Sequence, residues 1–270
     1  MARQCLRVLR RRGWLFNIRV ELGGASTDGS STGLPRPRPR GFLAVILKKM
    51  LTILKRQLRN VLFDTFVWDF RESGKTKTEI AAWLAAGKPV PPPNGVKYAT
   101  LTDYGAAFGL ETLIETGTFR GGAIYALKSR FKKLYSIELS PELAATAQHR
   151  FRSSPHIQIL QGNSGQLLPQ LLSGISQPCL LWLDGHYSGG ITAQGDLDTP
   201  ILKEMRTIFN HPCKDHVILI DDARLFDGTD DYPTIDGLRA LCMEERPNYD
   251  FSVINDIIRI TPARSVKTTY

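Results

Sequence analysis

Short apolar runs alternate with helical patterns from about residue 98 to residue 262 of this 270-residue chain. The predicted strands are 112–115, 134–138, 157–160, 180–183 and 217–220. The predicted helices between and around them are 98–108, 121–130, 141–151, 165–172, 199–209 and 235–244. Ser140 and Pro141 suit the N-cap and the first position of one of these helices. This alternation predicts an α/β domain with a parallel sheet and right-handed crossover connections.

Two further strands, 249–254 and 257–260, follow the last helix and are separated by Asn255 and Asp256. Two apolar strands joined by two turn-forming residues predict a β-hairpin. The hairpin adds an antiparallel strand to the sheet. The sequence therefore predicts a mostly parallel, seven-stranded sheet that ends in an antiparallel hairpin.

The positive charge of the chain is concentrated at its beginning. Residues 1–49 contain nine Arg, two Lys, one Asp and one Glu, which accounts for the whole net charge of +9. We predict that residues 1–41 form a disordered basic extension, because they lack the apolar periodicity needed to offset the entropy of ordering. A targeting segment, a nucleic-acid-binding tail and a stretch that is not native to the protein all remain open for it. The folded domain has no overall basic field, so we expect no nucleic-acid partner for it.

Residues 42–94 predict a helical extension followed by a linker. Apolar residues recur at three- and four-residue steps over 42–70, with basic residues on the other face, and this pattern predicts a basic amphipathic helix. A second short helix is expected over 75–88, and Pro89 to Pro93 predict a rigid connection. The first helix can bind a membrane surface or partner, or pack on the domain or a second subunit. We prefer packing, which makes a homodimer plausible. A catalytic domain is expected over 95–262 and a tail over 263–270.

The four cysteines have no C-x-x-C spacing, so the sequence indicates neither a zinc site nor a disulfide framework. This usage is typical of a reducing compartment, and we expect a cytoplasmic protein. The chain contains no apolar run of membrane-spanning length, so no membrane span is expected.

Polar groups follow three consecutive predicted strands. The first leads into a glycine-containing loop, residues 115–122, that is neither G-x-G-x-x-G nor a Walker loop, and its carboxylate Glu115 suits a cationic ligand such as a sulfonium amino acid. Glu138 ends the second strand, where a carboxylate can accept ribose hydroxyls. Asn163 and Ser164 follow the third, where amide and hydroxyl groups can bind an adenine edge. Because ligands of open α/β sheets bind outside the carboxyl ends of the strands, these groups indicate one nucleoside site.

Four segments, at 114–118, 136–139, 182–187 and 219–224, resemble motifs of class I S-adenosylmethionine-dependent methyltransferases. The similarity covers about 97–262 and is strongest to the branch with an E-T-G-T loop and an L-D-G-H strand end. It implies a Rossmann-like fold, with the final hairpin, and S-adenosylmethionine as cofactor. The cofactor-binding residues that it implies are Glu115, Thr116, Gly117, Thr118, Gly121, Glu138, Asn163, Ser164 and Asp184. Asn163 departs from the Asp that many relatives carry.

Carboxylates also end the fourth and fifth strands. In the similar magnesium-dependent O-methyltransferases of the macrocin and catechol types, such residues hold Mg²⁺. By that resemblance Asp184, Asp221 and Asp222 are the metal ligands. Asp184 and His186 are the candidate catalytic residues, with His186 as general base. Aspartates at strand ends also cap turns, and a pair between Arg224 and Asp222 would favour that structural interpretation.

The resulting hypothesis is methyl transfer to a hydroxyl group of a small molecule or sugar, with Mg²⁺ assistance. The Gly/Ser/Thr-rich loop 188–195 is a candidate lid over the substrate. Two alternatives remain. One is a non-catalytic domain that binds a nucleoside ligand and acts through protein contacts. The other is an NAD(P)-dependent oxidoreductase, which the missing G-x-G-x-x-G and the final hairpin disfavour.

Overall fold

The computed structural model describes residues 66–185, 199–264 and 266–270, with the side chains of 66–75 excepted. Four predictions therefore lie wholly or largely outside the described residues: the 1–41 extension, most of the 42–70 helix, the general base His186 and the 188–195 loop. None of the helices within the described ranges combines the length and apolar character needed to cross a membrane.

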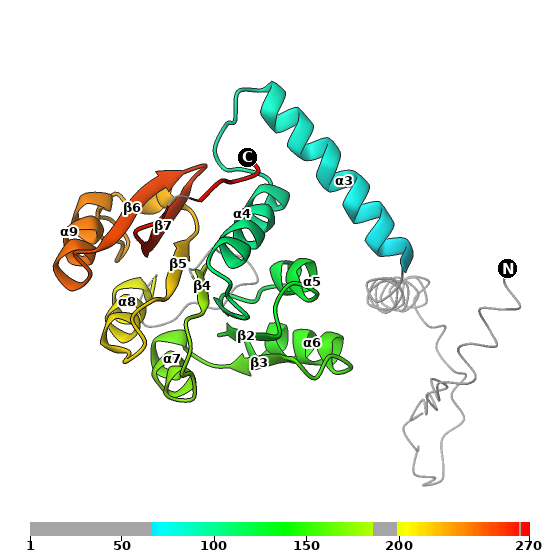
Figure 1. The fold of residues 1–270 in the computed structure, drawn as a ribbon. Helices are drawn as coiled ribbons and strands as arrows, with labels where there is room; N and C mark the ends of the chain where they lie inside the picture. The colour runs from blue at the N-terminus through cyan, green and yellow to red at the C-terminus, as the bar shows by residue number, and fades with distance from the viewer. Residues whose placement is uncertain (1–65, 186–198, 265) are drawn as a thin grey trace, which may run out of the picture. The chain divides into compact units, whose positions relative to one another are not determined.

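The strands form one seven-stranded sheet in the order β3-β2-β1-β4-β5-β7-β6 (Figure 1). They are β1 (Thr112–Thr116), β2 (Lys133–Glu138), β3 (Ile157–Gln161), β4 (Leu180–Leu183), β5 (Val217–Ile220), β6 (Tyr249–Ile254) and β7 (Ile257–Pro262). The pairs among β1 to β5 are parallel, whereas β7 is antiparallel to both β5 and β6. The predicted fold class is thus confirmed. The chain order reverses between β1 and β4, which places a topological switch point at the centre of the sheet.

The final hairpin turns as its sequence predicts. Asn255 and Asp256 both have positive φ, at 53° and 61°. Two consecutive left-handed residues form the type I′ turn, whose twist matches the twist of the flanking strands. The turn lets β7 insert between β5 and β6 with reversed direction.

Helices cover both faces of the sheet. They are α4 (Asn94–Ala107), α5 (Gly122–Leu127), α6 (Pro141–Phe151), α7 (Ser164–Ser173), α8 (Ile201–Asn210) and α9 (Ile235–Glu245), with a short 3₁₀ helix η1 (Ala223–Leu225) after β5. Leu113 packs with the core of α4, α5 and α6, and the next residue, Ile114, packs with the core of α7, α8 and α9. Because successive strand residues point to opposite faces, an apolar strand supplies both cores. The result is a three-layer α/β/α architecture.

The helix before the domain, α3 (Phe66–Ala85), corrects one prediction. The sequence predicted one helix ending at residue 70 and another starting at residue 75, but α3 is continuous across residues 71–74, where the sequence predicted a gap. A glycine inside a helix, here Gly74, costs only about 1 kcal/mol relative to alanine, and the surrounding helix compensates for it. Near its end Ile80 and Trp83 pack against Val96 of α4.

Candidate active site

The carboxylate of the penultimate residue of β1 is buried under its neighbours. Glu115 is only 2% exposed, and Ser136 Oγ donates a 2.5 Å hydrogen bond to its Oε2. Ser136 also shares a hydrogen bond with the hydroxyl of Thr118, so the loop after β1 is tied to β2. Burial raises the pKa of Glu115 to about 8, the Ser136 hydrogen bond opposes this shift, and the charge of Glu138 adds to it. A cationic ligand at this point would restore the charged form.

The glycine loop is fastened between the ends of β2 and β4. Gly117 has φ of 89°, and a Cβ on it would lie 2.2 Å from the carbonyl oxygen of Asp184. Its amide donates to Ile137, and the amide of Asp184 donates to Thr116. The close approach requires glycine on steric grounds, independently of any ligand. Gly121, the N-cap of α5, is held in the same left-handed region at 68°.

Backbone amides orient the carboxylate that ends β2. Glu138 accepts a 2.7 Å hydrogen bond from the amide of Phe119 and a 2.9 Å bond from the amide of Ser140. Each oxygen of a carboxylate has a second acceptor position. The side chain is therefore fixed in place and can still accept hydrogen bonds from vicinal hydroxyls.

The residues after β3 lie at the start of α7. Asn163 is half-buried and occupies the N-cap position, but its side chain makes no capping hydrogen bond. Its amide is therefore not used to cap the helix. Ser164 is buried in the first turn of α7. Both residues thus lie at the same edge of the sheet as Glu138, as the sequence predicted.

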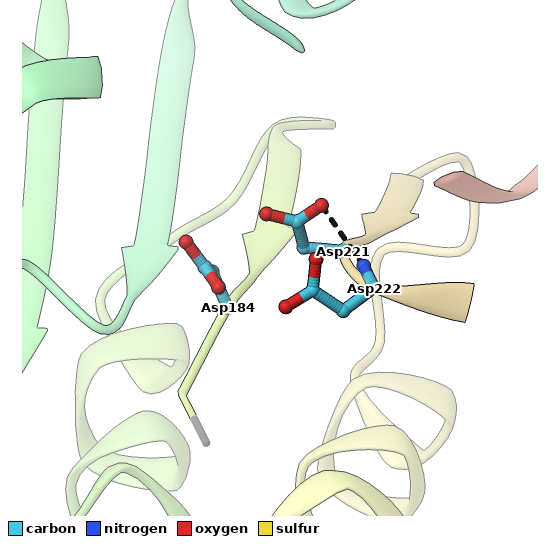
Figure 2. Close-up of side chains that lie close together, drawn as sticks. All are labelled: Asp184, Asp221 and Asp222. Carbon is cyan, nitrogen blue, oxygen red and sulfur yellow. Dashed lines mark hydrogen bonds between the residues drawn. The ribbon is translucent and has the colours of Figure 1, made fainter. Parts of the chain in front are cut away.

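Three aspartates converge at the ends of β4 and β5. Asp184, Asp221 and Asp222 each offer a carboxylate oxygen, and these atoms lie within 4.8 Å of one another. Figure 2 shows Asp184 after one strand and the other two after the next, with the Asp222 carboxylate turned toward Asp184. The amide of Asp222 donates to Asp221 Oδ1 at 2.9 Å, which fixes that side chain. The structure brings together the three residues that the resemblance implied as ligands.

A lysine from α4 enters this cluster, and sequence reasoning missed it. Lys97 Nζ lies 2.5 Å from Asp221 Oδ2 and 3.4 Å from Asp222 Oδ1. Burial lowers the pKa of Lys97, but the charge of Asp221 and the hydrogen bond to it prevail, so the pKa is raised. The ammonium form is thus the one that the cluster stabilises. No motif indicated this contact, because Lys97 lies 124 residues before Asp221.

Burial and mutual repulsion raise the pKa values of Asp184 and Asp221. For Asp184 burial is the largest cause and the charge of Asp221 the next, while Lys97 opposes them. For Asp221 burial raises the pKa to about 6, against the opposing charge of Lys97. Carboxylates crowded in this way favour a cation that compensates their charge.

Asp222 also has a structural role. Arg224 Nη1 lies 2.8 Å from Asp222 Oδ1 and pairs with Asp256 in the hairpin turn as well. Asp222 itself has φ of 55° and occupies the N-cap position of η1, where its side chain makes no capping hydrogen bond. The ion pair between Arg224 and Asp222, which the sequence analysis linked to a structural role for Asp222, is thus present. It links the end of β5 to the hairpin, and the three carboxylates still face one another.

The donor set fits a divalent cation. Carboxylate oxygens are the hard ligands that Mg²⁺ prefers, and the cluster already attracts a cationic group of the chain itself. Asp184, Asp221 and Asp222 would hold the ion.

A second buried charged residue that the sequence analysis missed lies near the end of β4. Glu204 of α8 is 1% exposed, and burial raises its pKa to about 7. Hydrogen bonds with Ser164 and Thr116 oppose this rise in pKa, and the Oε1 of Glu204 and the Oγ1 of Thr116 both lie near Gly185. Glu204 lies among the buried helix positions Ile201, Met205 and Ile208, so a charge on an apolar face was the signal available. Thr116, the last residue of β1, lies beside the carboxylate of Glu204.

A small cleft of about 10 Å³, enough for about one water molecule, is lined by both Glu204 and Asp221. Asp221 and Glu204 contribute its charged groups, and Phe226 and Tyr232 contribute aromatic surface. The rings of Phe226 and Tyr232 pack edge to face, with centroids 5.1 Å apart. The cleft thus combines acceptor oxygens with an aromatic wall beside the predicted metal ligands.

Comparison with known proteins finds similarity at the level of structure alone. No protein-family model and no curated protein sequence matches the chain. An O-methyltransferase from Bacillus cereus in complex with SAH is 14% identical, with 70% of this chain and 90% of that chain covered and a TM-score of 0.47. The O-methyltransferase TomG from Streptomyces achromogenes, in complex with SAM, is 15% identical, with 70% and 89% covered and a TM-score of 0.47. The SAH-bound methyltransferase PaMTH1 from Podospora anserina is 14% identical, with 74% and 97% covered and a TM-score of 0.47.

The strand order and the reversed β7 define the class of fold without these comparisons. The sheet is mostly parallel, switches direction between β1 and β4, and carries an antiparallel strand between β5 and β6. This is the Rossmann-like fold of class I methyltransferases, as the resemblance in sequence implied.

Proposed function

We propose that this chain is an S-adenosylmethionine-dependent methyltransferase that methylates a hydroxyl group of a small molecule or sugar, with Mg²⁺ assistance. The observation that carries the proposal is the pair of buried carboxylates, Glu115 and Glu138, at the ends of adjacent strands beside the switch point. Such a position is where open α/β sheets bind nucleoside ligands. Glu115 suits the cationic amino-acid end of such a ligand, and Glu138 suits the hydroxyls of its ribose.

Each cofactor contact follows from the chemistry of a side chain. Glu115 attracts the cationic amino-acid end, because a charge-assisted contact offsets the cost of ionising a buried carboxyl. Glu138 is held by the amides of Phe119 and Ser140 and accepts the ribose hydroxyls. Asn163 and Ser164 then bind the adenine edge. The reactive methyl group would lie toward the ends of β4 and β5.

The transfer is an in-line displacement. The acceptor oxygen forms a bond to the methyl carbon while the carbon–sulfur bond breaks, and the electron pair of that bond stays on sulfur, which gives S-adenosylhomocysteine. The protein supplies proximity, alignment and removal of the acceptor proton. A bound Mg²⁺ would lower the pKa of the acceptor hydroxyl. Asp184, Asp221 and Asp222 would hold that ion, and His186 is the predicted base.

Calorimetric titration with S-adenosylhomocysteine tests the cofactor assignment. We expect micromolar binding to the full chain and no comparable binding of NAD⁺. Glu138→Gln should weaken binding by about tenfold to a hundredfold, since a hydrogen bond to a charged group contributes roughly 1.5–3 kcal/mol. Glu142→Gln is the matched control, because Glu142 is an exposed carboxylate in the first turn of α6, the helix that follows Glu138 in the chain.

The outcomes separate the alternatives. Binding of S-adenosylhomocysteine that Glu138→Gln leaves unchanged would exclude the ribose role of Glu138. Binding of NAD⁺ in its place would favour the oxidoreductase. A methyl-transfer screen with radiolabelled S-adenosylmethionine and hydroxylated acceptors then distinguishes an enzyme from a domain that only binds the nucleoside.

A further inference from the structure

Lys97 places an ammonium group of the chain itself among the predicted metal ligands. Its Nζ contacts Asp221 at 2.5 Å and Asp222 at 3.4 Å, and its side chain is only 12% exposed. The charge of Asp184 also acts on it. All three carboxylates that would hold a divalent cation therefore act on the same ammonium group.

The packing of α4 fixes Lys97 in this position. The neighbouring Val96 is fully buried against Ile80 and Trp83 of α3, and Leu101 of the next turn is fully buried in the core beneath α4. Thr100 is also buried, and its hydroxyl donates to the carbonyl of Val96. Lys97 is thus anchored by residues on both sides of it in the helix. Its contact with the aspartates follows from how the helix docks on the sheet.

An ammonium group and a divalent cation compete for this cluster. Both are cations that bind its carboxylates, and two positive charges a few ångströms apart repel strongly in a buried site. Resting on the metal-assisted function proposed above, we propose that Lys97 is the resident cation of the metal-free site and that a divalent ion binds by displacing it. Lys97 thereby lowers the affinity for metal and keeps the carboxylates compensated when no metal is bound.

Metal binding to the full chain tests this proposal without any activity measurement. Mn²⁺ is the probe, titrated by calorimetry and by the loss of its free paramagnetic signal. Lys97→Met should bind Mn²⁺ at least tenfold more tightly than the natural protein, and Mn²⁺ should raise its melting temperature by a larger amount. Lys97→Arg keeps the charge and should remain close to the natural affinity.

Lys132→Met is the matched control for loss of a positive charge. Lys132 forms a surface pair with Glu111, and its side chain is 74% exposed. Its removal should leave Mn²⁺ affinity unchanged. If Lys97→Met does not fold without metal, Lys97→Gln provides a polar replacement of similar length for the same titration.

An equal or weaker Mn²⁺ affinity in Lys97→Met and Lys97→Gln would overturn the proposal, and so would the absence of Mn²⁺ binding to every variant. Binding of S-adenosylhomocysteine, measured on the same samples, separates this result from the cofactor assignment. A tighter Mn²⁺ site without cofactor binding supports the role of Lys97 and rejects the methyltransferase. Binding of S-adenosylhomocysteine without tighter Mn²⁺ binding in Lys97→Met supports the cofactor assignment and rejects the role proposed for Lys97.

Discussion

Glu115 and Glu138 are carboxylates at the ends of adjacent strands, yet their surroundings give them different roles. Glu138 accepts two backbone amides, whereas Glu115 accepts one hydroxyl and lies deeper. Burial favours the protonated form of Glu115, and the single hydrogen bond from Ser136 only partly opposes this. The difference predicts a pH dependence of cofactor binding that originates at Glu115.

Affinity for S-adenosylhomocysteine should rise as pH increases from about 6 to about 8. Burial raises the pKa of Glu115 to about 8, so the free protein holds a proton there below that pH. A cationic amino-acid arm favours the carboxylate, and binding below pH 8 therefore releases the proton. Titrations at pH 7 in buffers of different ionisation enthalpy measure this release, which Glu115→Gln should abolish. Proton release that persists in that variant would assign it to another group.

Glu204 gives a second residue-scale prediction, in stability. Burial raises its pKa to about 7 from an ordinary 4.5, so the folded state binds more protons than the unfolded state between these values. Stability is lost as pH rises through this range, because the folded protein must then hold a buried charge. Glu204→Gln should therefore raise the free energy of unfolding at pH 8 by about 1–3 kcal/mol and change it little at pH 4.5. Urea unfolding at the two pH values checks this, and destabilisation at pH 8 would indicate that the carboxylate makes a needed contact.

At the scale of elements, the site depends on how closely the β1–α5 loop approaches the end of β4. Gly117 and Gly109 both have positive φ, at 89° and 65°. A Cβ on Gly117 would overlap the Asp184 carbonyl, whereas a Cβ on Gly109 would meet nothing within 4 Å. A comparison of alanine substitutions at the two glycines therefore separates the cost of backbone strain from the cost of steric overlap.

Gly109→Ala should cost only about 1 kcal/mol of stability, the usual penalty for a left-handed alanine. Gly117→Ala adds an overlap with backbone atoms that have no rotamer to change, and we expect a loss of at least about 2–3 kcal/mol. It should also weaken S-adenosylhomocysteine binding by displacing Asp184. Urea unfolding of the two variants side by side measures the difference, and similar losses would show that the loop moves to accommodate the methyl group.

At the scale of the whole molecule, a buried hydrogen-bond chain lies at the opposite ends of β4 and β5. The amide of Cys179 donates to His216 Nδ1, His216 Nε2 lies 2.8 Å from His211 Nδ1, and His211 Nε2 lies 2.9 Å from the carbonyl of Leu172. The chain is satisfied when both imidazoles are neutral with the proton on Nε2. It joins the two strands to α7 and to the end of α8.

Acid should destabilise the protein through this chain. Burial lowers the pKa of His216 to about 4 from 6.5, and the nearby His211 adds to the shift. The unfolded state binds more protons between these values, so stability is complete above about pH 6.5 and falls toward pH 4. The loss is at most about 3 kcal/mol. Unfolding curves at pH 7 and pH 4.5 should show less of this loss for His216→Gln than for the natural protein, and equal losses would place the acid sensitivity elsewhere.

Local patterns predicted most of the elements within the domain. Helix α6 and the strands β4 and β5 have the predicted bounds, because a Ser-Pro start or a short apolar run is itself the physical cause of the element. Ser140 does accept a hydrogen bond from Leu143 as an N-cap. The gap predicted between residues 70 and 75 was wrong, since the helix continues through Gly74 at a cost of only about 1 kcal/mol relative to alanine.

The sequence by itself determined the order of strands and helices, the reversed final hairpin and the strand ends that carry Glu115, Glu138 and the aspartates. Periodicity, turn residues and strand ends are properties of neighbouring residues, so they can be recognised in the sequence without knowledge of the fold. Only the tertiary structure decided that Lys97 reaches Asp221 and that Glu204 is buried beside Thr116. These contacts join residues far apart in the chain. They arise because α4 packs on one face of the sheet and α8 packs on the other. Docking of that kind is fixed by side-chain packing across the whole core, which no local pattern encodes.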